Sequence, residues 1–265
     1  MRTGKEIYSN LPIKDQIHLL GEQLRPYPWK IAIDGPAAAG KGTLLAGLID
    51  ELKLEQCPTG DMYRAVTIYL TEILRLDPPT LDDTKLASCL TDFSITFTTD
   101  AEDKKHVIIR SPSRDIAEDV TNELQDPAIG KRISAIARRN PVRDVLDKLQ
   151  LDMFTKGRTV IEGRDMWQIA RNDANILIYL YARNDVLMVR ETKRQKERGV
   201  TLTPEDAAVI VTKRNADDNT RKRGKLLTPK EARKSHVYNL IIDTSDIAPD
   251  EILRDVLLKL SKIKR

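Results

Sequence analysis

The stretch Lys30-Ile-Ala-Ile-Asp-Gly-Pro-Ala-Ala-Ala-Gly-Lys-Gly-Thr43 decides the fold of this chain. Residues 30–34 form a short apolar run of the kind that buried strands have. Two glycines and a lysine follow with the spacing G-x-x-x-x-G-K, which is typical of a phosphate-binding loop. A helical pattern comes directly after the loop. Strand, glycine-rich turn and helix in this order predict an α/β fold with a parallel sheet.

The residue types of the loop suit a nucleoside triphosphate. Small residues let backbone N–H groups approach phosphate oxygens, and the helix that follows adds the positive end of its dipole. Lys41 supplies a mobile cation for the β- and γ-phosphates. Gly42 separates this lysine from Thr43, and the resulting G-K-G-T is a form found in nucleoside monophosphate kinases. We therefore expect ATP to be bound by Gly35, Pro36, Ala37, Ala38, Ala39, Gly40, Lys41, Gly42 and Thr43.

Further strands and helices are indicated on both sides of the loop. The pattern of residues 92–110 alternates between apolar and polar, with a polar turn in the middle, which predicts a hairpin in an insertion. Ile13, Ile17, Leu20 and Leu24 have helical spacing, so residues 1–29 are expected to form an N-terminal extension with an amphipathic helix. Buried strands are expected at 159–163, 175–181 and 239–243.

The composition excludes several classes of protein. Because 40% of the 265 residues are hydrophobic, the chain can build a core, and wholesale disorder is excluded. No apolar run reaches the roughly 20 residues of a membrane-spanning helix, and residues 1–16 lack the apolar core of a signal peptide. Two cysteines make no disulfide framework, so we expect a cytoplasmic protein with no membrane partner.

The net charge is small and its distribution matters more than its sum. The chain has 44 Lys and Arg against 40 Asp and Glu, which gives +4. Basic residues crowd 131–143 and 183–234, but acids and apolar residues are interleaved with them. No aromatic-and-basic motif of a nucleic-acid module is present, so no nucleic-acid partner is expected. An anion site inside a balanced protein is the other interpretation of this small excess.

The sequence resembles the bacterial-type cytidylate kinases over roughly residues 30–260. Any one short motif would be weak, but here several occur in the family's order. The matching segments are Gly35–Thr43, Thr59-Gly-Asp-Met-Tyr-Arg64, the hairpin region to about residue 123, Ser134 with Pro141-Val-Arg143, Gly163-Arg-Asp-Met166, Arg214-Asn-Ala-Asp-Asp218-Asn-Thr-Arg221, and 239–246.

This resemblance implies a P-loop NTPase fold and a phosphotransferase. It implies a parallel sheet flanked by helices in a kinase domain at 30–265, with a monophosphate-binding insertion at about 91–133 and a lid at about 185–215. The implied reaction is ATP-dependent phosphorylation of CMP and dCMP in pyrimidine nucleotide metabolism. The protein is expected to be a monomer, with self-association through the N-terminal helix as the alternative.

The resemblance also implies roles for the acceptor site. Ser134, Arg143 and Asp165 would read cytosine, whose amine can donate to a carboxylate and whose N3 and O2 can accept from an arginine. The remaining CMP-binding residues would hold the sugar and the monophosphate: Thr59, Arg64, Arg164, Arg214, Asp218 and Arg221. Asp165 has a second interpretation as a helix N-cap, and Ser134 as a surface serine.

Catalysis would rest on position and charge, because the acceptor phosphate is already a nucleophile. Mg²⁺ would be held mainly by ATP phosphates and water, with help from Thr43 and Asp34. The expected catalytic residues are Lys41, Arg164 and two arginines of the lid, Arg190 and Arg194.

Two departures from the family pattern keep alternatives open. Asp217 stands where the family has an arginine, and Trp167 stands where it has a glycine. They motivate a second hypothesis, a nucleotide-binding regulator with weak catalysis. The nearest enzyme alternative is a kinase for UMP or AMP, because the G-K-G-T loop is shared.

Overall fold

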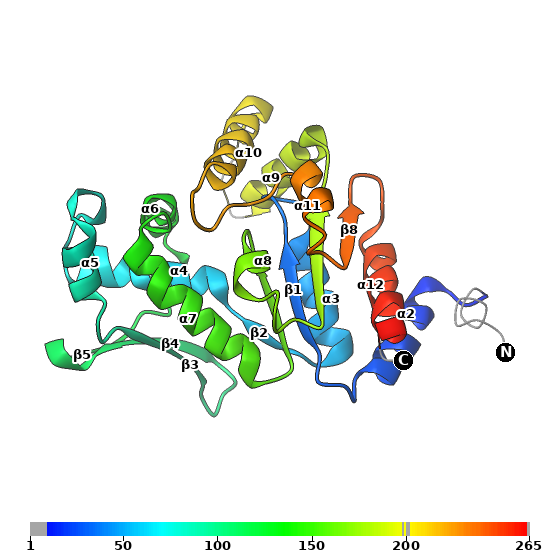
Figure 1. Ribbon diagram of the computed structural model, residues 1–265, viewed down its shortest axis with the longest axis horizontal. Coiled ribbons are helices and arrows are strands. Elements are labelled where there is room, and N and C mark those ends of the chain that lie inside the picture. Colours follow the sequence, from blue (N-terminus) through cyan, green and yellow to red (C-terminus); the bar gives the residue numbers. More distant parts are fainter. Residues whose placement is uncertain (1–9, 198, 200–201, 264–265) are drawn as a thin grey trace. The chain divides into compact units, whose positions relative to one another are not determined.

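Strand β1 (Lys30–Asp34) lies at the centre of a five-stranded sheet in which every pairing is parallel (Figure 1). The strand order is β2-β6-β1-β7-β8. The other strands are β2 (Glu55–Cys57), β6 (Thr159–Gly163), β7 (Ile176–Tyr181) and β8 (Leu240–Asp243). The register pairs Asp34 with Gly163 and Tyr179, so the carboxyl ends of three strands meet. That edge is where ligands bind in open α/β sheets.

The computed structural model describes residues 10–197, 199 and 202–263. In it the chain forms two compact units, of which the first contains the parallel sheet and consists of residues up to 57 and from 153 onward. Its helices are α2 (Ile13–Leu24), α3 (Lys41–Leu52), α8 (Met166–Ile169), α9 (Asn184–Glu197), α10 (Pro204–Asn219), α11 (Pro229–Ser235) and α12 (Pro249–Ile263).

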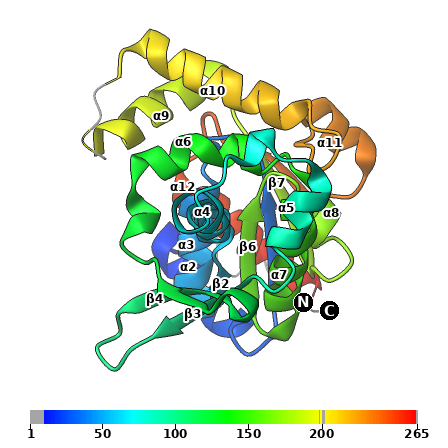
Figure 2. The ribbon, with the colours of Figure 1, turned by 90° about the vertical axis from the view of Figure 1, so that its left-hand side faces the viewer.

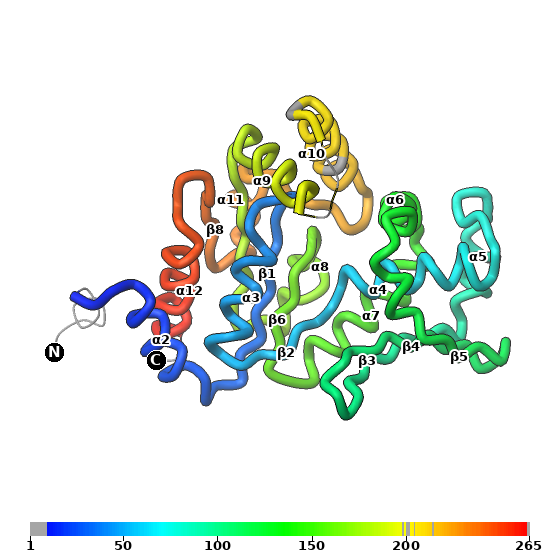
Figure 3. The backbone as a smooth tube through the Cα atoms, turned by 180° about the vertical axis from the view of Figure 1, so that it is seen from behind, coloured from blue at the N-terminus to red at the C-terminus, as the bar shows by residue number. Residues whose placement is uncertain are grey.

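The core of this unit lies between the sheet and helices α2, α3 and α12. α3 buries Leu44, Leu45, Leu48 and Leu52 at helical spacing, because these positions share one face. α2 packs against both α3 and α12, as Figures 1 and 3 show. Helices α9 and α10 also pack against each other (Figure 2). The mixed α/β fold with helices flanking a parallel sheet is thus confirmed.

The second unit, residues 58–152, contains a three-stranded sheet. Strands β3 (Ser94–Thr99) and β4 (Lys105–Ser111) form the predicted antiparallel hairpin, and β5 (Ile116–Asp119) adds a strand that the sequence did not indicate. The helices are α4 (Thr59–Ile68), the π-turn η1 (Tyr69–Ile73), the 3-10 turns η2 (Pro78–Thr80), η3 (Pro112–Arg114) and η4 (Glu123–Gln125), α5 (Asp83–Cys89), α6 (Pro127–Ile136) and α7 (Asn140–Lys156).

The chain returns to the first unit within α7. Among the helices that the structure describes, we find none with the length and apolar content needed to cross a membrane. Cys57 and Cys89 are not joined in a disulfide.

Candidate active site

The phosphate loop joins β1 to α3 and needs glycine at two positions. Gly35 has a φ of +148°, and a Cβ there would lie 2.1 Å from the carbonyl oxygen of Leu180 on β7. Gly40 has a φ of +93° and immediately precedes α3. Only glycine adopts both conformations without strain. Glycine is therefore required at position 35 for lack of room beside Leu180, and at position 40 for its backbone conformation.

The side chain of Lys41 lies across this loop. Its Nζ donates to the carbonyl oxygens of Gly35 and Pro36, both at 2.9 Å. These two bonds hold the ammonium over the turn, where phosphate oxygens would approach it.

Asp34, the last residue of β1, is fully buried and binds the start of α8. Its carboxylate accepts the backbone N–H groups of Met166 at 2.8 Å and Trp167 at 2.9 Å, and the hydroxyl of Tyr238 at 3.0 Å. Burial raises the pKa of Asp34 to about 6, and these hydrogen bonds oppose the rise. Asp34 thus holds α8 next to the loop, while a role in magnesium binding stays a prediction.

Asp165 precedes α8 and is 6% exposed. Its side chain makes no capping hydrogen bond to that helix. Asp34 supplies the caps instead, from a position 132 residues away in the chain. The geometry therefore disfavours the interpretation of Asp165 as a simple N-cap.

Arg164, Asp218 and Arg221 form a buried charged cluster. Arg164 Nη1 lies 2.5 Å from one carboxylate oxygen of Asp218, and Arg221 Nη2 lies 2.6 Å from the other. Burial lowers the pKa of Arg164; Asp218 opposes this, and the nearby cations Arg221 and Arg194 add to it. The structure thus brings together two segments that the sequence analysis assigned to the acceptor site.

Asn215 connects this cluster to the phosphate loop, and sequence reasoning missed it. Its Oδ1 accepts the backbone N–H of Ala37 at 3.1 Å and is 3.4 Å from Arg164 Nη1. The only signal in the sequence was its place in the segment from Arg214 to Arg221.

The two arginines of the predicted lid differ in their contacts. Arg190 donates to the carbonyl and hydroxyl oxygens of Thr244, at 2.6 and 2.8 Å, and lies 3.5 Å from the carbonyl oxygen of Ala38. Arg194 pairs with the buried Glu191 at 2.5 Å. Arg190 therefore braces the loop, whereas Arg194 contributes to the field around Arg164. The side chain of Arg214 lies outside the described part of the structure.

The second unit holds its own group of predicted residues. Arg143 is 1% exposed and donates to the hydroxyl of Tyr63 at 3.1 Å, with Asp147 3.5 Å away. Arg64 donates to the carbonyl oxygen of Leu124 at 2.7 Å. Thr59 is the first residue of α4, and Ser134 lies half-buried on α6.

Comparison with known proteins decides the family. The sequence model of the family described as cytidylate kinase matches residues 31–262. The chain belongs to the cytidylate kinase family. A cytidylate kinase of Pelotomaculum thermopropionicum is 32% identical over 89% of this chain and 97% of its own length. A cytidylate kinase of Thermosipho melanesiensis is 30% identical over 87% of this chain and 95% of its own.

Family membership makes the protein a phosphotransferase with a phosphate acceptor and makes its reaction the ATP-dependent phosphorylation of CMP. Among solved structures, a shikimate kinase from Bacteroides thetaiotaomicron covers 89% of this chain and 99% of its own, with 12% identity and a TM-score of 0.40. That score is too low for the likeness to bear on function.

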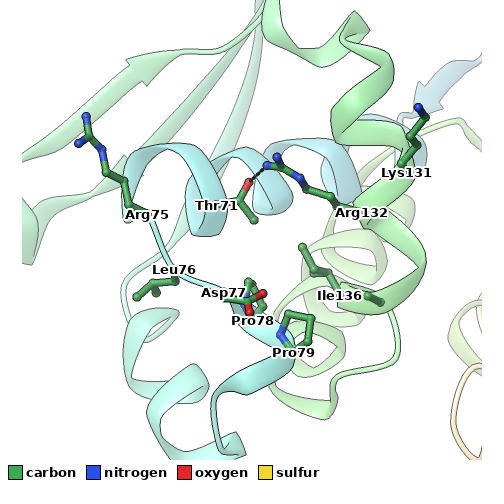
Figure 4. A pocket seen from close by; sticks show the side chains of 10 residues that line it. Thr71, Arg75, Leu76, Asp77, Pro78, Pro79, Lys131, Arg132 and Ile136 are labelled. Carbon is green, nitrogen blue, oxygen red and sulfur yellow. Dashed lines mark hydrogen bonds between the residues drawn. The ribbon is translucent and has the colours of Figure 1, made fainter.

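A cavity of about 600 Å³ lies in the second unit (Figure 4). α6 contributes Lys131, Arg132 and Ile136 to its wall, and Arg132 donates to the hydroxyl of Thr71 at 3.2 Å. None of the residues that line it was assigned to this kinase's substrate site.

Proposed function

We propose that the enzyme transfers the γ-phosphoryl group of ATP to CMP and dCMP through the buried cluster around Asp218. Arg164, Arg194 and Arg221 surround this region, while Asp218 and Glu191 supply the acids that pair with them. Within the part of the chain that the structure describes, the Nε atoms of Arg194 and Arg221 are buried and have no hydrogen-bond acceptor. Buried donors of this kind need a partner, and an anion is the partner that would also balance three arginines against two acids. This surplus of buried donors is the observation that carries the proposal.

The donor half of the site is the phosphate loop. Backbone N–H groups at the start of α3 and the ammonium of Lys41 would bind the β- and γ-phosphates. Arg190, held by Thr244, would keep the loop in shape.

The residues around the loop fit a magnesium ion that is held mostly by oxygens of the nucleotide phosphates and of water. Glu162 Oε1 lies 3.9 Å from the point where a Cβ on Gly42 would stand, so a carboxylate faces the loop beside Thr43. No group of three His, Cys, Asp or Glu side chains able to hold a metal occurs among the described residues. The carboxylate of Glu162 and the hydroxyl of Thr43 are oxygen donors of the kind that suits Mg²⁺, which keeps several waters and binds phosphates. When bound, the ion would neutralise charge on the transferring phosphoryl group.

The acceptor half would read both ends of the nucleotide. Arg64 and Arg164 would hold the monophosphate, because a guanidinium matches phosphate oxygens in a planar fork. Asp218 would accept a sugar hydroxyl, with Arg214 and Arg221 beside it and Thr59 near the phosphate. Ser134, Arg143 and Asp165 would read the edge of cytosine. No general base is needed, since the acceptor phosphate is ionised at neutral pH.

A panel of monophosphates tests the reaction. ADP production is followed with ATP, Mg²⁺ and CMP, dCMP, UMP, AMP or GMP as the acceptor. We expect turnover with CMP and dCMP. Turnover with AMP or GMP and none with CMP would overturn the assignment, and nucleotide binding without turnover would support a regulator instead.

Asp165 gives a sharper test of base recognition. Loss of a hydrogen bond to a charged group costs about 1.5–3 kcal/mol, so Asp165→Ala should raise KM for CMP at least tenfold and leave KM for ATP unchanged. Asp173→Ala, in an exposed turn nearby, is the matched control. An equal rise in both KM values would show a structural effect.

For the assembly we propose a monomer. The buried face of α2 (Ile17, Leu20 and Leu24) packs against α3 and α12 of the same chain, so this face is already covered without a second copy. The measurement is the mass in solution. A cytoplasmic location stays a prediction.

A further inference from the structure

We infer that Trp167 is a positioning residue that joins the two acceptor-binding segments of the first unit. Its place in the chain is close to the site, because Arg164 and Asp165 immediately precede α8, where Trp167 is the second residue. This inference rests on the proposed function of those residues.

The indole of Trp167 binds a distant segment. Its Nε1 donates to the carbonyl oxygen of Lys225 at 3.0 Å. The next residue, Gln168, accepts the backbone N–H of Gly224 at 2.9 Å through its side chain. The Trp167 ring also packs on the cluster of Tyr179, Leu226, Leu227 and Ala232. α8 is therefore bonded at two adjacent points to residues 224–225.

That segment is in turn bonded to Asp218. The backbone N–H of Leu226 donates to the carbonyl oxygen of Asp218 at 3.0 Å, which closes the loop that follows α10. The Asp218 side chain then pairs with Arg164. These contacts form a closed circuit. It runs from Arg164 along the chain to Trp167, then to residues 225–226 and Asp218, and back to Arg164. Loosening the indole bond would let the two segments move apart and would weaken acceptor binding alone.

The chain offers a matched control. It has two tryptophans, and Trp29 also donates its Nε1 to a backbone carbonyl oxygen, that of Leu24 at 2.8 Å. Trp29 belongs to the main core, where its indole bonds the last residue of α2. Trp167→Phe and Trp29→Phe therefore remove the same kind of hydrogen bond in two places.

The experiment compares KM for CMP, KM for ATP and the melting temperature of both full-length variants. We expect Trp167→Phe to raise KM for CMP about fivefold, the factor that corresponds to one hydrogen bond, with KM for ATP unchanged. Trp29→Phe should lower the melting temperature and leave both KM values unchanged. The exposed Gln168→Ala should raise KM for CMP in the same sense without disturbing the core.

Several results would overturn the inference. One such result is that Trp167→Phe and Gln168→Ala have the same KM for CMP as Trp29→Phe. Another is a parallel change in both KM values that follows the loss of stability. If Trp29→Phe and the wild type both bind CMP but do not phosphorylate it, the proposed function fails instead. If Trp167→Phe does not fold, Gln168→Ala alone decides.

Discussion

Arg164 and Asp218 form an ion pair with a 2.5 Å N–O distance, and the same carboxylate also binds Arg221. All three side chains are largely shielded from solvent. A carboxylate that bridges two buried guanidinium groups neutralises charge that water cannot reach. Arg164 and Arg221 therefore share one carboxylate, that of Asp218.

Replacing Asp218 should destabilise the folded protein. Asp218→Ala strands two buried arginines, and we expect it to lower the free energy of unfolding by about 3–5 kcal/mol. Urea denaturation measures this. Asp246→Ala, which removes an exposed partner of Arg183, should leave the stability near the wild-type value. Similar losses in the two variants would contradict the structural role given to Asp218.

The ammonium of Lys41 should matter for catalysis more than for folding. Lys41→Met removes the cation that two loop carbonyls hold, and we expect kcat to fall by about 10²–10³. The melting temperature should change little. Lys53→Met, just after the last residue of α3, should keep full activity because Lys53 pairs with the exposed Asp50. Steady-state kinetics at saturating ATP and CMP decide the outcome.

The phosphate loop should not tolerate a side chain at its first glycine. Gly35→Ala would place a Cβ 2.1 Å from the Leu180 carbonyl oxygen, so it should destabilise the protein by about 1–3 kcal/mol and reduce ATP binding. Gly60→Ala meets nothing within 4 Å on helix α4 and should be neutral or slightly stabilising. Equal stability of both variants would show that the loop relaxes freely.

His106 should make stability depend on pH. Its two ring nitrogens lie 2.6 Å from Asp119 and 3.0 Å from Asp100, and these carboxylates raise its pKa. The folded state then binds a proton more tightly than the unfolded state, whose pKa is near 6.5. The stabilisation is complete below about 6.5 and is lost as the pH rises through the folded-state pKa.

Unfolding in urea at a series of pH values measures this dependence. His106→Gln should flatten the curve above about pH 6.5. The pKa of Asp119 is lowered to about 2, chiefly by the hydroxyl of Thr121 and then by His106, so its own contribution is lost only as the pH falls toward that value. An unchanged curve in the variant would mean that the hairpin does not depend on this histidine.

The local parts of the fold could be predicted from the sequence. The loop from Gly35 to Thr43 and the hairpin around residues 94–111 carry their signals in adjacent residues, through glycine spacing and alternation. Strand β5 could not be found, because Ile116–Asp119 is short and has one apolar residue followed by mostly polar ones. It forms a strand because it can pair with the edge of the sheet at β4.

Parts of the site depend on contacts between distant residues, and these had no local signal. Asp34 caps a helix that begins 132 residues later, and Asn215 reaches the N–H of Ala37 across 178 residues. Trp167 was visible only as a departure from a family pattern. Its bond to the Lys225 carbonyl oxygen needed the folded chain.

The packing of α2 against α12 joins two helices that are made at different times during synthesis. α2, with its apolar face of Ile17, Leu20 and Leu24, is synthesised before α12, whose buried residues include Val256 and Leu257, and most of the described chain lies between the two helices. Contacts between such distant segments form late and slowly. Until α12 has been made, α3 is the only one of these two partners that can cover the apolar face of α2, and a nascent chain that stalls before α12 would present the rest of that face to chaperones or to other chains.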